Sequence, residues 1–492
     1  MTKILALDQS TSATKALLFE PDGQLLDSVS VSHQQYYPKA GWVEHDAEEI
    51  YQNTLQVLQQ LIQKSDLSAS DLHCLSITNQ RETIVVFDRD TGKPLHNAIV
   101  WQCRRGDPIC QALIRDGHEK SVHQKTGLKI DTYFPASKLA WLLFNYPSIK
   151  QKLENGEALI GTIDTYLVYR LTGGAVFATD HSNASRTLLF NITTLGWDEG
   201  LCRLFNIPIK ALPEIRESSE QFGHTDLNGL LMPSIPICGV MGDSQAALFA
   251  QRCFSPGDAK VTLGTGSSVL LNIGETLRYS QNGLLSAIGW VYKGKPTYAF
   301  EGIINYSGAT IAWLRDQLQL IKSSAETEEI ALSVEDNGGV YLVPAFVGLN
   351  APYWRSDIKA AIVGMTPATT KAHVVRAAVE SIAYQIKDVL ELMAGDAGTE
   401  LNAIHGDGGA VKNRFLMQFI ADLAGITARA SELAELSALG AVFAGTLGMG
   451  LYSSLDELRS IGSDYVNYEP QMEAAQASEL YAGWQAAVQQ VL

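Results

Sequence analysis

The fold is decided by residues 4–19, ILALDQSTSATKALLF, near the start of the chain. The largely apolar stretches 4–7 and 15–19 predict two strands, and the polar residues between them predict the turn of a β-hairpin. A turn built from serine and threonine presents several backbone N–H groups and hydroxyls to one point. Such a turn can hold a phosphate group with little help from lysine or arginine.

A second stretch, AKVTLGTGSSVLL at 259–271, has the same design of strand, small hydroxyl-rich turn and strand. Thr11 and Thr265 stand about half a chain length apart, which is the pattern of a duplicated protein. Two unrelated turns rich in glycine and threonine remain the alternative. Ser-Pro-Gly at 255–257 interrupts the pattern and predicts a hinge. We therefore expect domains at 1–252 and 253–492 with a cleft between them.

The composition is that of a globular protein, with 46% hydrophobic and 18% charged residues among 492. The net charge of −16 excludes nucleic acid and anionic membrane as partners, so any bound anion must be held by local donors. No apolar run is long enough to insert into a membrane or to form the core of a signal peptide. Six scattered cysteines indicate reduced thiols in a cytoplasmic protein.

Short apolar runs alternate with helical patterns, which predicts an α/β architecture. Apolar residues at helical spacing predict a helix at 47–64, with Asp46 as its N-cap. Strands are expected at 75–78 and 84–87. The stretch 289–296, GWVYKGKP, nearly matches a P-loop, but Pro296 replaces the hydroxyl that would hold magnesium. We interpret it as a hairpin turn. A glycine cluster at 406–413 is either an ordinary turn or a place where a flat ligand meets backbone.

Several blocks together carry a family resemblance. They are LDQ at 7–9 with Thr11, GWVEHD at 41–46, NQRET at 79–83, WQCRR at 101–105, NASRT at 183–187, GTG at 264–266 and APYW at 351–354. In this order they resemble the FGGY carbohydrate kinases, and within them the glycerol kinases. The resemblance spans essentially the whole chain. It implies two RNase H-like domains of the actin, hexokinase and Hsp70 type, with a catalytic cleft between them.

Phosphoryl transfer needs a base near the accepting hydroxyl and a cation that spreads charge. From the residues alone, Asp243 is either the N-cap of a helix at 246–250 or a carboxylate that takes a proton. The resemblance implies that Asp243 is the general base. It also implies that Asp8 is catalytic and holds Mg²⁺, through water, because magnesium keeps several of its waters.

The remaining site residues follow from the same resemblance. For ATP binding they are Thr11, Ser12, Lys15, Thr265, Gly308, Gly409 and Asn413. For binding of the acceptor they are Arg81, Glu82, Trp101, Tyr133, Asp243 and Ser244. A polyol has C–H and O–H faces, which suits one aromatic wall and several charged groups.

Three positions depart from the pattern of glycerol kinases. Ser244 and Ala312 stand where glutamine is usual, and Ser268 stands where phenylalanine is usual. The two serines predict a larger and more polar acceptor pocket. We expect phosphorylation of glycerol to glycerol 3-phosphate. The alternatives are a four- or five-carbon polyol or ketose (erythritol, D-ribulose, D-xylulose), or a non-catalytic sugar sensor. The family analogy adds a homodimer or homotetramer.

Overall fold

The structure, a computed structural model, describes residues 2–355, 357–462 and 465–492. It divides into two compact units. The first contains Met1–Arg252, Ser286–Tyr298 and Glu435–Gly462. The second contains Cys253–Leu285, Ala299–Ala434 and Ser463–Leu492. The first long segment ends at Arg252, and the two short segments of the first unit come from residues 253–492.

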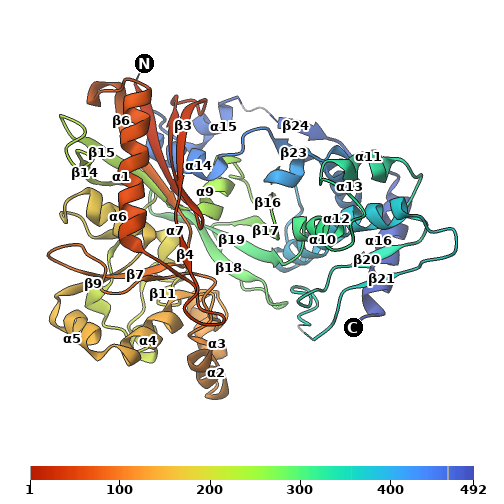
Figure 1. The fold of residues 1–492 in the computed structure, drawn as a ribbon, viewed down its shortest axis with the longest axis horizontal. Helices are drawn as coiled ribbons and strands as arrows, with labels where there is room; N and C mark the ends of the chain where they lie inside the picture. The colour runs from red at the N-terminus through yellow and green to blue at the C-terminus, as the bar shows by residue number, and fades with distance from the viewer. Residues whose placement is uncertain (1, 356, 463–464) are drawn as a thin grey trace. The chain divides into compact units, whose positions relative to one another are not determined.

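The first unit is built on a six-stranded sheet (Figure 1) with the order β14-β15-β6-β1-β2-β3. Its strands are β1 (Lys3–Gln9), β2 (Ala13–Phe19), β3 (Leu25–Ser32), β6 (Leu72–Asn79), β14 (Gln221–Thr225) and β15 (Ile235–Gly242). β1 and β2 form the predicted antiparallel hairpin, while β6 lies parallel to β1 on its other side. The hairpin register places Asp8 opposite Lys15.

Helices cover both faces of this sheet. Leu5, Leu7 and Ile77 share a buried cluster with residues of α1 (Ala47–Lys64) and α6 (Ile163–Leu171). α1 has the predicted bounds and cap, since Asp46 accepts the backbone N–H of Glu48 at 2.8 Å. Alternate residues of a strand face opposite ways, so Ser76 belongs to the other face, where it lies against Gly445 of α14 (Leu436–Gly448).

The reason that α14 joins the first unit is its apolar surface. Its residues 438–447 are all buried, so both sides of the helix must be covered by protein. It packs against β15 and β6 and against α9 (Asp243–Ala250). Gly440 permits the contact with α9, because a Cβ at this position would lie 1.8 Å from the carbonyl oxygen of Ala246. The packing of α14, and not its position in the chain, therefore places residues 435–462 in the first unit.

A five-stranded sheet of the first unit has the order β4-β5-β8-β7-β9. Its strands are β4 (Gln35–Tyr36), β5 (Glu44–His45), β7 (Ile84–Asp88), β8 (Ala98–Ile99) and β9 (Ala158–Thr162). The short strands are β10 (Ala178–Asp180), β11 (Phe190–Asn191), β12 (Gly196–Trp197) and β13 (Glu214–Arg216). The remaining helices are α2 (Asp107–Arg115), α3 (Glu119–Thr126), α4 (Pro135–Asn145), α5 (Pro147–Asn155), α7 (His181–Ala184), α8 (Glu199–Leu204) and α15 (Leu455–Ser460), with 3₁₀ turns at Ala69–Asp71 and Ile209–Ala211.

A seven-stranded sheet has the order β18-β19-β17-β16-β22-β23-β24. Its strands are β16 (Asp258–Leu263), β17 (Ser267–Gly274), β18 (Leu285–Tyr292), β19 (Lys295–Ile304), β22 (Ala403–Asp407), β23 (Ala428–Ser431) and β24 (Tyr465–Tyr468). β16 is antiparallel to β17 and parallel to β22, as β1 is to β2 and β6. The order β19-β17-β16-β22-β23 thus repeats β3-β2-β1-β6-β15, and the duplication is confirmed.

The second unit contains the helices α10 (Gly308–Asp316), α11 (Glu326–Leu332), α12 (Lys371–Ala397), α13 (Arg414–Ala424) and α16 (Ala474–Gln489), the pair β20 (Tyr341–Val343) and β21 (Ala361–Val363), and the 3₁₀ turn η3 (Gly409–Lys412). Lys293 and Gly294 turn the chain between β18 and β19, which confirms the hairpin in place of a P-loop. All six cysteines are free and buried. Among the described residues, no helix has the length and hydropathy needed to cross a membrane.

Candidate active site

The first predicted phosphate turn, residues 10–13, closes on itself at the end of the β1–β2 hairpin. The backbone N–H and the hydroxyl of Ser10 both donate to the carbonyl of Ala13, at 2.9 and 3.0 Å. Within the described part of the chain, the backbone N–H groups of Thr11 and Ser12 donate to no acceptor. Two amide donors at the tip of a tight turn form an anion-binding concavity.

Three charged side chains stand beside this turn. Lys15 donates to both carboxylate oxygens of Glu435, at 2.8 and 2.9 Å. Burial raises the pKa of the Asp8 carboxyl to about 7; Lys15 opposes this, and the negative charges of Glu435 and Asp243 add to it. Glu435 is a residue that the sequence did not single out, because nothing near it in the chain points to Lys15.

Arg81, Glu82, Arg186 and Asp243 form what we call the charged cluster. The Arg81 Nε lies 3.1 Å from Asp243 Oδ1, and its Nη1 donates to Gln245 Oε1 at 3.0 Å. The Arg186 Nε donates to Glu82 Oε1 at 2.6 Å, and both side chains are almost fully buried. The Asp243 side chain is 39% exposed, which makes it the most accessible member of the cluster to a ligand.

Local backbone geometry brings these side chains together. Asp243 is the first residue of α9, and Gly242 is the N-cap, so the capping alternative for Asp243 does not hold. Gly242 also makes room for Arg81, because a Cβ there would lie 2.8 Å from its Cγ. Glu82 has a φ of 61°, which is rare for a residue with a side chain and indicates strain that the surrounding contacts hold in place.

An aromatic pair adjoins this part of the first unit. The rings of Trp101 and Tyr133 lie 5.4 Å apart between centroids, at an interplanar angle of 59°. The Trp101 indole N–H donates to the Thr11 hydroxyl at 3.0 Å. The buried Lys138 donates to the Tyr133 carbonyl at 2.7 Å, and burial lowers its pKa to about 8. Lys138 and Arg186 were both missed, although Arg186 lies inside the NASRT block.

In the second unit, the turn at 264–266 is fastened to the start of α10. The backbone N–H groups of Ser307 and Ala309 donate to the Thr265 carbonyl, and that of Gly308 donates to the Gly264 carbonyl. Only glycine fits at 308, because a Cβ would lie 2.6 Å from the Gly264 oxygen. As in the first turn, the backbone N–H groups of Thr265 and Gly266 donate to no acceptor among the described residues.

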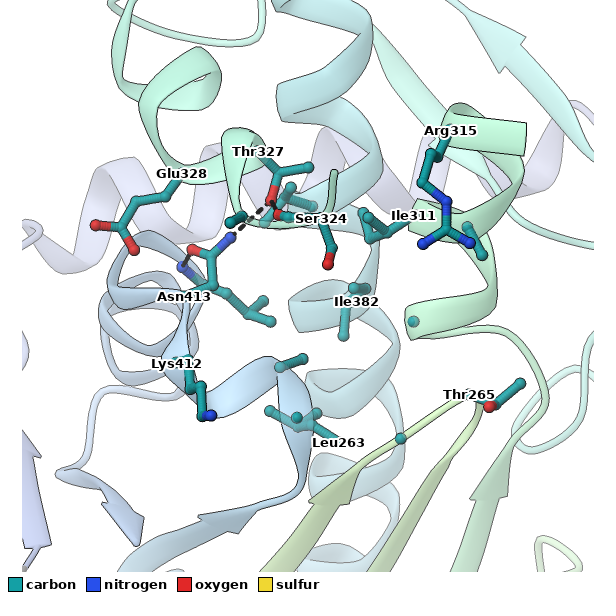
Figure 2. Close-up of a pocket in the computed structure, with 18 residues that line it drawn as sticks. Leu263, Thr265, Ile311, Arg315, Ser324, Thr327, Glu328, Ile382, Lys412 and Asn413 are labelled. Atoms are coloured by element: carbon teal, nitrogen blue, oxygen red, sulfur yellow. Dashed lines mark hydrogen bonds between the residues drawn. The ribbon is translucent and has the colours of Figure 1, made fainter. Parts of the chain in front are cut away.

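A cavity of about 480 Å³ opens beside this turn (Figure 2), wholly within the second unit. Ile311, Val379, Ile382 and Leu416 supply apolar walls. The predicted nucleotide residues of this unit all line it: Thr265, Gly308, Gly409 and Asn413. Volume and lining suit a flat, largely apolar ring system with polar groups at its edge.

Asn413, Gly409 and Ala312 shape the cavity in different ways. Asn413 caps α13 by accepting the Leu416 N–H at 2.9 Å, and its amide donates to the Thr327 hydroxyl at 3.0 Å, as Figure 2 shows. A Cβ at Gly409 would meet nothing within 4 Å, so this residue leaves open space. Ala312, where glutamine was expected from the resemblance, also lines the cavity and contributes no polar group.

Asp8 fits a cation held mainly by water and by ligand phosphates. In the described residues its carboxylate accepts no hydrogen bond, and no three histidine, cysteine or acidic side chains converge on one point. A single buried carboxylate is a poor complete site. It is a suitable anchor for Mg²⁺, which keeps several waters and is commonly held by one or two carboxylates plus phosphates.

Family models match both parts of the chain. Residues 3–250 match the N-terminal domain of the FGGY family of carbohydrate kinases, and residues 259–449 match its C-terminal domain. Glycerol kinase 1 of Thermotoga maritima is 50% identical over 489 residues, covering 99% of each chain. A glycerol kinase of Carboxydothermus hydrogenoformans is 48% identical, covering 99% of this chain and 98% of its own.

A solved structure of similar fold is the glycerol kinase of Plasmodium falciparum with ADP. It has a TM-score of 0.95 and 38% identity, and the match covers 100% of this chain and 98% of that one. A xylulose kinase of Lactobacillus acidophilus, at 22% identity and a TM-score of 0.88, shows the same fold. With both family models matched along the chain, this protein belongs to the FGGY family of carbohydrate kinases and is a phosphotransferase with two domains of the actin and hexokinase type.

Proposed function

We propose that the chain is a cytoplasmic, ATP-dependent glycerol kinase that makes glycerol 3-phosphate. The observation that carries the proposal is Asp243: a reachable carboxylate at the start of α9, with Arg81 Nε at 3.1 Å. A base for a sugar hydroxyl must be accessible and fixed in direction, and Asp243 meets both conditions. The relatives named glycerol kinases, at up to 50% identity over nearly the whole chain, support the choice of acceptor.

In the proposed reaction Asp243 accepts the proton of the attacking glycerol hydroxyl. Arg81 donates hydrogen bonds to the other hydroxyls of glycerol, and Glu82 accepts hydrogen bonds from them. Trp101 and Tyr133 pack against the carbon chain of glycerol. Arg186 acts on Glu82 and not on the acceptor, because its Nε holds the Glu82 oxygen at 2.6 Å. Orientation of the acceptor is the main contribution of such a cluster, since phosphoryl transfer depends on in-line geometry.

The nucleotide contacts fall into two groups, each within one unit. We assign the ring system and sugar of ATP to the cavity that Gly409 and Asn413 line, and its phosphates to Thr265 and Gly308. We assign Thr11, Ser12 and Lys15 to the terminal phosphates. Asp8 would hold magnesium through water, and bound magnesium would spread the charge of the transferred phosphoryl group. The Plasmodium relative with ADP supports the adenine nucleotide.

The test is ADP release by the purified protein with triols, tetritols, pentitols and ketoses, for the wild type and Asp243→Asn. Glycerol should give the highest kcat/KM. Asp243→Asn should lose at least about 10²-fold in kcat, the usual scale of a lost general base, while ADP binding stays within about twofold. Asp107→Asn is the matched control, because Asp107 also begins a helix, α2, outside the cluster. Near-normal turnover of Asp243→Asn would refute the assigned base.

A second candidate acceptor is a four- or five-carbon polyol or ketose. The observation in its favour is Ser244, a short side chain directly after Asp243 that is only half-buried. Turnover of a ketopentose without turnover of glycerol in the same panel would favour this candidate and refute glycerol. The base Asp243 would then keep its role.

A further inference from the structure

Trp101 makes one polar contact with its side chain that an apolar wall does not need. Its indole Nε1 donates to Oγ1 of Thr11 at 3.0 Å. Thr11 belongs to the phosphate turn, and Trp101 lies ninety residues further along the chain, after β8. The same ring is paired with that of Tyr133, tilted at 59° with the centroids 5.4 Å apart. One side chain therefore contacts both the acceptor region and the phosphate turn of the first unit.

The direction of this hydrogen bond is fixed by chemistry. An indole N–H can only donate, whereas a hydroxyl has one donor and two acceptor positions. Thr11 is therefore the acceptor in this pair, and its own O–H is left to point elsewhere. A hydroxyl that accepts a hydrogen bond is polarised and becomes a better donor. Trp101 thereby leaves Thr11 as a donor, which is the role that an anionic phosphate oxygen requires.

A second set of contacts fixes the two residues relative to each other. The Trp101 backbone N–H donates to the Thr83 hydroxyl at 3.3 Å, and that hydroxyl donates to Gln80 Oε1 at 2.8 Å. The Gln80 amide in turn donates to Gln9 Oε1 and to the Ser10 carbonyl, at 3.0 and 3.2 Å. Gln80 and Thr83 are buried, so the chain of contacts from Trp101 to the turn is shielded from water.

The Thr11 carbonyl is held as well. Gln35 donates its side-chain amide to this oxygen at 3.1 Å. With the carbonyl and the hydroxyl oxygen both engaged, the donors that remain on Thr11 are its backbone N–H and its O–H. These two donors match an oxyanion and do not match a cationic ligand.

We propose that Trp101 is a positioning residue for nucleotide phosphate, which acts by holding the Thr11 hydroxyl as a donor toward the terminal phosphate of ATP. The proposal rests on the proposed function and adds to the role of Trp101 as an aromatic wall. It separates the ring into two parts: the face serves the acceptor, and the N–H edge serves the nucleotide. Phenylalanine at this position keeps an aromatic face and removes the N–H.

The test compares full-length wild type, Trp101→Phe, Thr11→Val and the double variant. Affinity for a non-hydrolysable ATP analogue is measured by calorimetry without acceptor, and KM is measured for ATP and glycerol separately. Trp101→Phe should weaken binding of the ATP analogue and raise the KM for ATP, each by about 3- to 10-fold, which is the usual effect of losing one hydrogen bond. The KM for glycerol should change less than about twofold, since the aromatic face remains.

The double variant tests the route of the effect. Once Thr11→Val has removed the hydroxyl, Trp101→Phe should have little further effect on analogue affinity, because the two residues act as one unit. Thr11→Ser keeps the hydroxyl, so its affinity for the analogue should stay near that of the wild type. It controls for a folding defect caused by substitution at this position. Trp197→Phe is the control: its indole also donates, to the Pro213 carbonyl at 2.7 Å, and its loss should leave analogue affinity unchanged.

Several outcomes would overturn the proposal. An unchanged affinity of Trp101→Phe for the ATP analogue would overturn it. So would a double variant whose loss of analogue affinity equals the sum of the losses in Trp101→Phe and Thr11→Val. A change confined to the KM for glycerol would leave Trp101 as an aromatic wall only. Failure of the wild type to phosphorylate glycerol would instead refute the proposed acceptor. The analogue titrations contain no acceptor, so the positioning role is judged separately.

Discussion

The charged cluster of the first unit and the cavity of the second unit solve different physical problems. The cluster holds two arginine and two acidic side chains, three of the four almost fully buried, in contacts of 2.6 and 3.1 Å. The cavity is walled by Ile311, Val379, Ile382 and Leu416, and its Lys412 and Arg315 are exposed. One region is specified by fixed charge, and the other is specified by shape.

The difference follows from what each region must recognise. Buried charges are costly, so they persist where direction matters, as at a group that takes a proton. A flat ring system needs area and room, which glycine and branched aliphatic side chains supply. One of the buried carboxyls of the second unit is held differently from Glu82. Asp388 on α12 accepts hydrogen bonds from three neutral donors, Tyr353, Tyr481 and Trp484, where Glu82 has an arginine.

The largest expected effect comes from removing the charge that offsets Glu82. Arg186→Met should lower the free energy of unfolding by about 3–5 kcal/mol, because it leaves a buried carboxylate without its nearest cation. It should also raise the KM for the acceptor and leave ADP affinity unchanged. Denaturant titration and kinetics check this. Arg203→Met is the control: its pair with Glu199 is 74% exposed on both sides and should contribute almost nothing. Equal losses in both variants would contradict the role given to the cluster.

The next effect concerns Asp388 and pH. Burial raises the pKa of Asp388 to about 6, against the lowering effect of its Tyr and Trp donors. A carboxyl whose pKa is higher in the folded state stabilises the fold fully below its unfolded pKa of about 4, and this contribution is lost as the pH rises through about 6. The advantage of wild type over Asp388→Asn should therefore shrink by about 2–3 kcal/mol between pH 4 and 7. Unfolding titrations across this range measure it, and parallel curves would contradict it.

A third change tests whether shape alone specifies the cavity. Gly409→Val should place a side chain into open space and weaken ADP binding by about tenfold or more, since the filled volume is denied to the ligand. The melting temperature should hardly change, because a Cβ there meets no neighbour within 4 Å. Gly395→Val is the control, since Gly395 is equally open but lies outside the cavity. Unchanged ADP affinity in Gly409→Val would place the nucleotide elsewhere.

The smallest effect concerns the range of acceptors. Ser244→Gln should lengthen the side chain next to Asp243 and fill part of the acceptor region. We expect kcat/KM for four- and five-carbon acceptors to fall about three- to tenfold relative to glycerol, the scale of a small steric change in a pocket. The acceptor panel measures the ratio. An unchanged ratio would remove Ser244 from the explanation of acceptor range.

Much of the fold was readable because local patterns were strong. The hairpin at 4–19 and the helix Ala47–Lys64 with its Asp46 cap are confirmed, since alternation and capping act over a few residues. The capping alternative for Asp243 was wrong by one residue, because Gly and Asp are both acceptable N-caps and only the backbone decides. The packing of α14 could not be predicted for a different reason: a helix that is apolar on all sides is expected to be buried, but its sequence does not indicate which unit covers it.

The site divides in the same way. The sequence by itself determined the duplicated hairpins, the two-domain architecture and the family, because turn chemistry and ordered motifs are local features. Only the tertiary structure decided that Glu435 meets Lys15, that Arg186 holds Glu82 and that the Trp101 indole donates to Thr11. Each of these pairs joins residues 90 or more positions apart. Such contacts depend on how helices and strands pack, and no pattern along the chain carries that information.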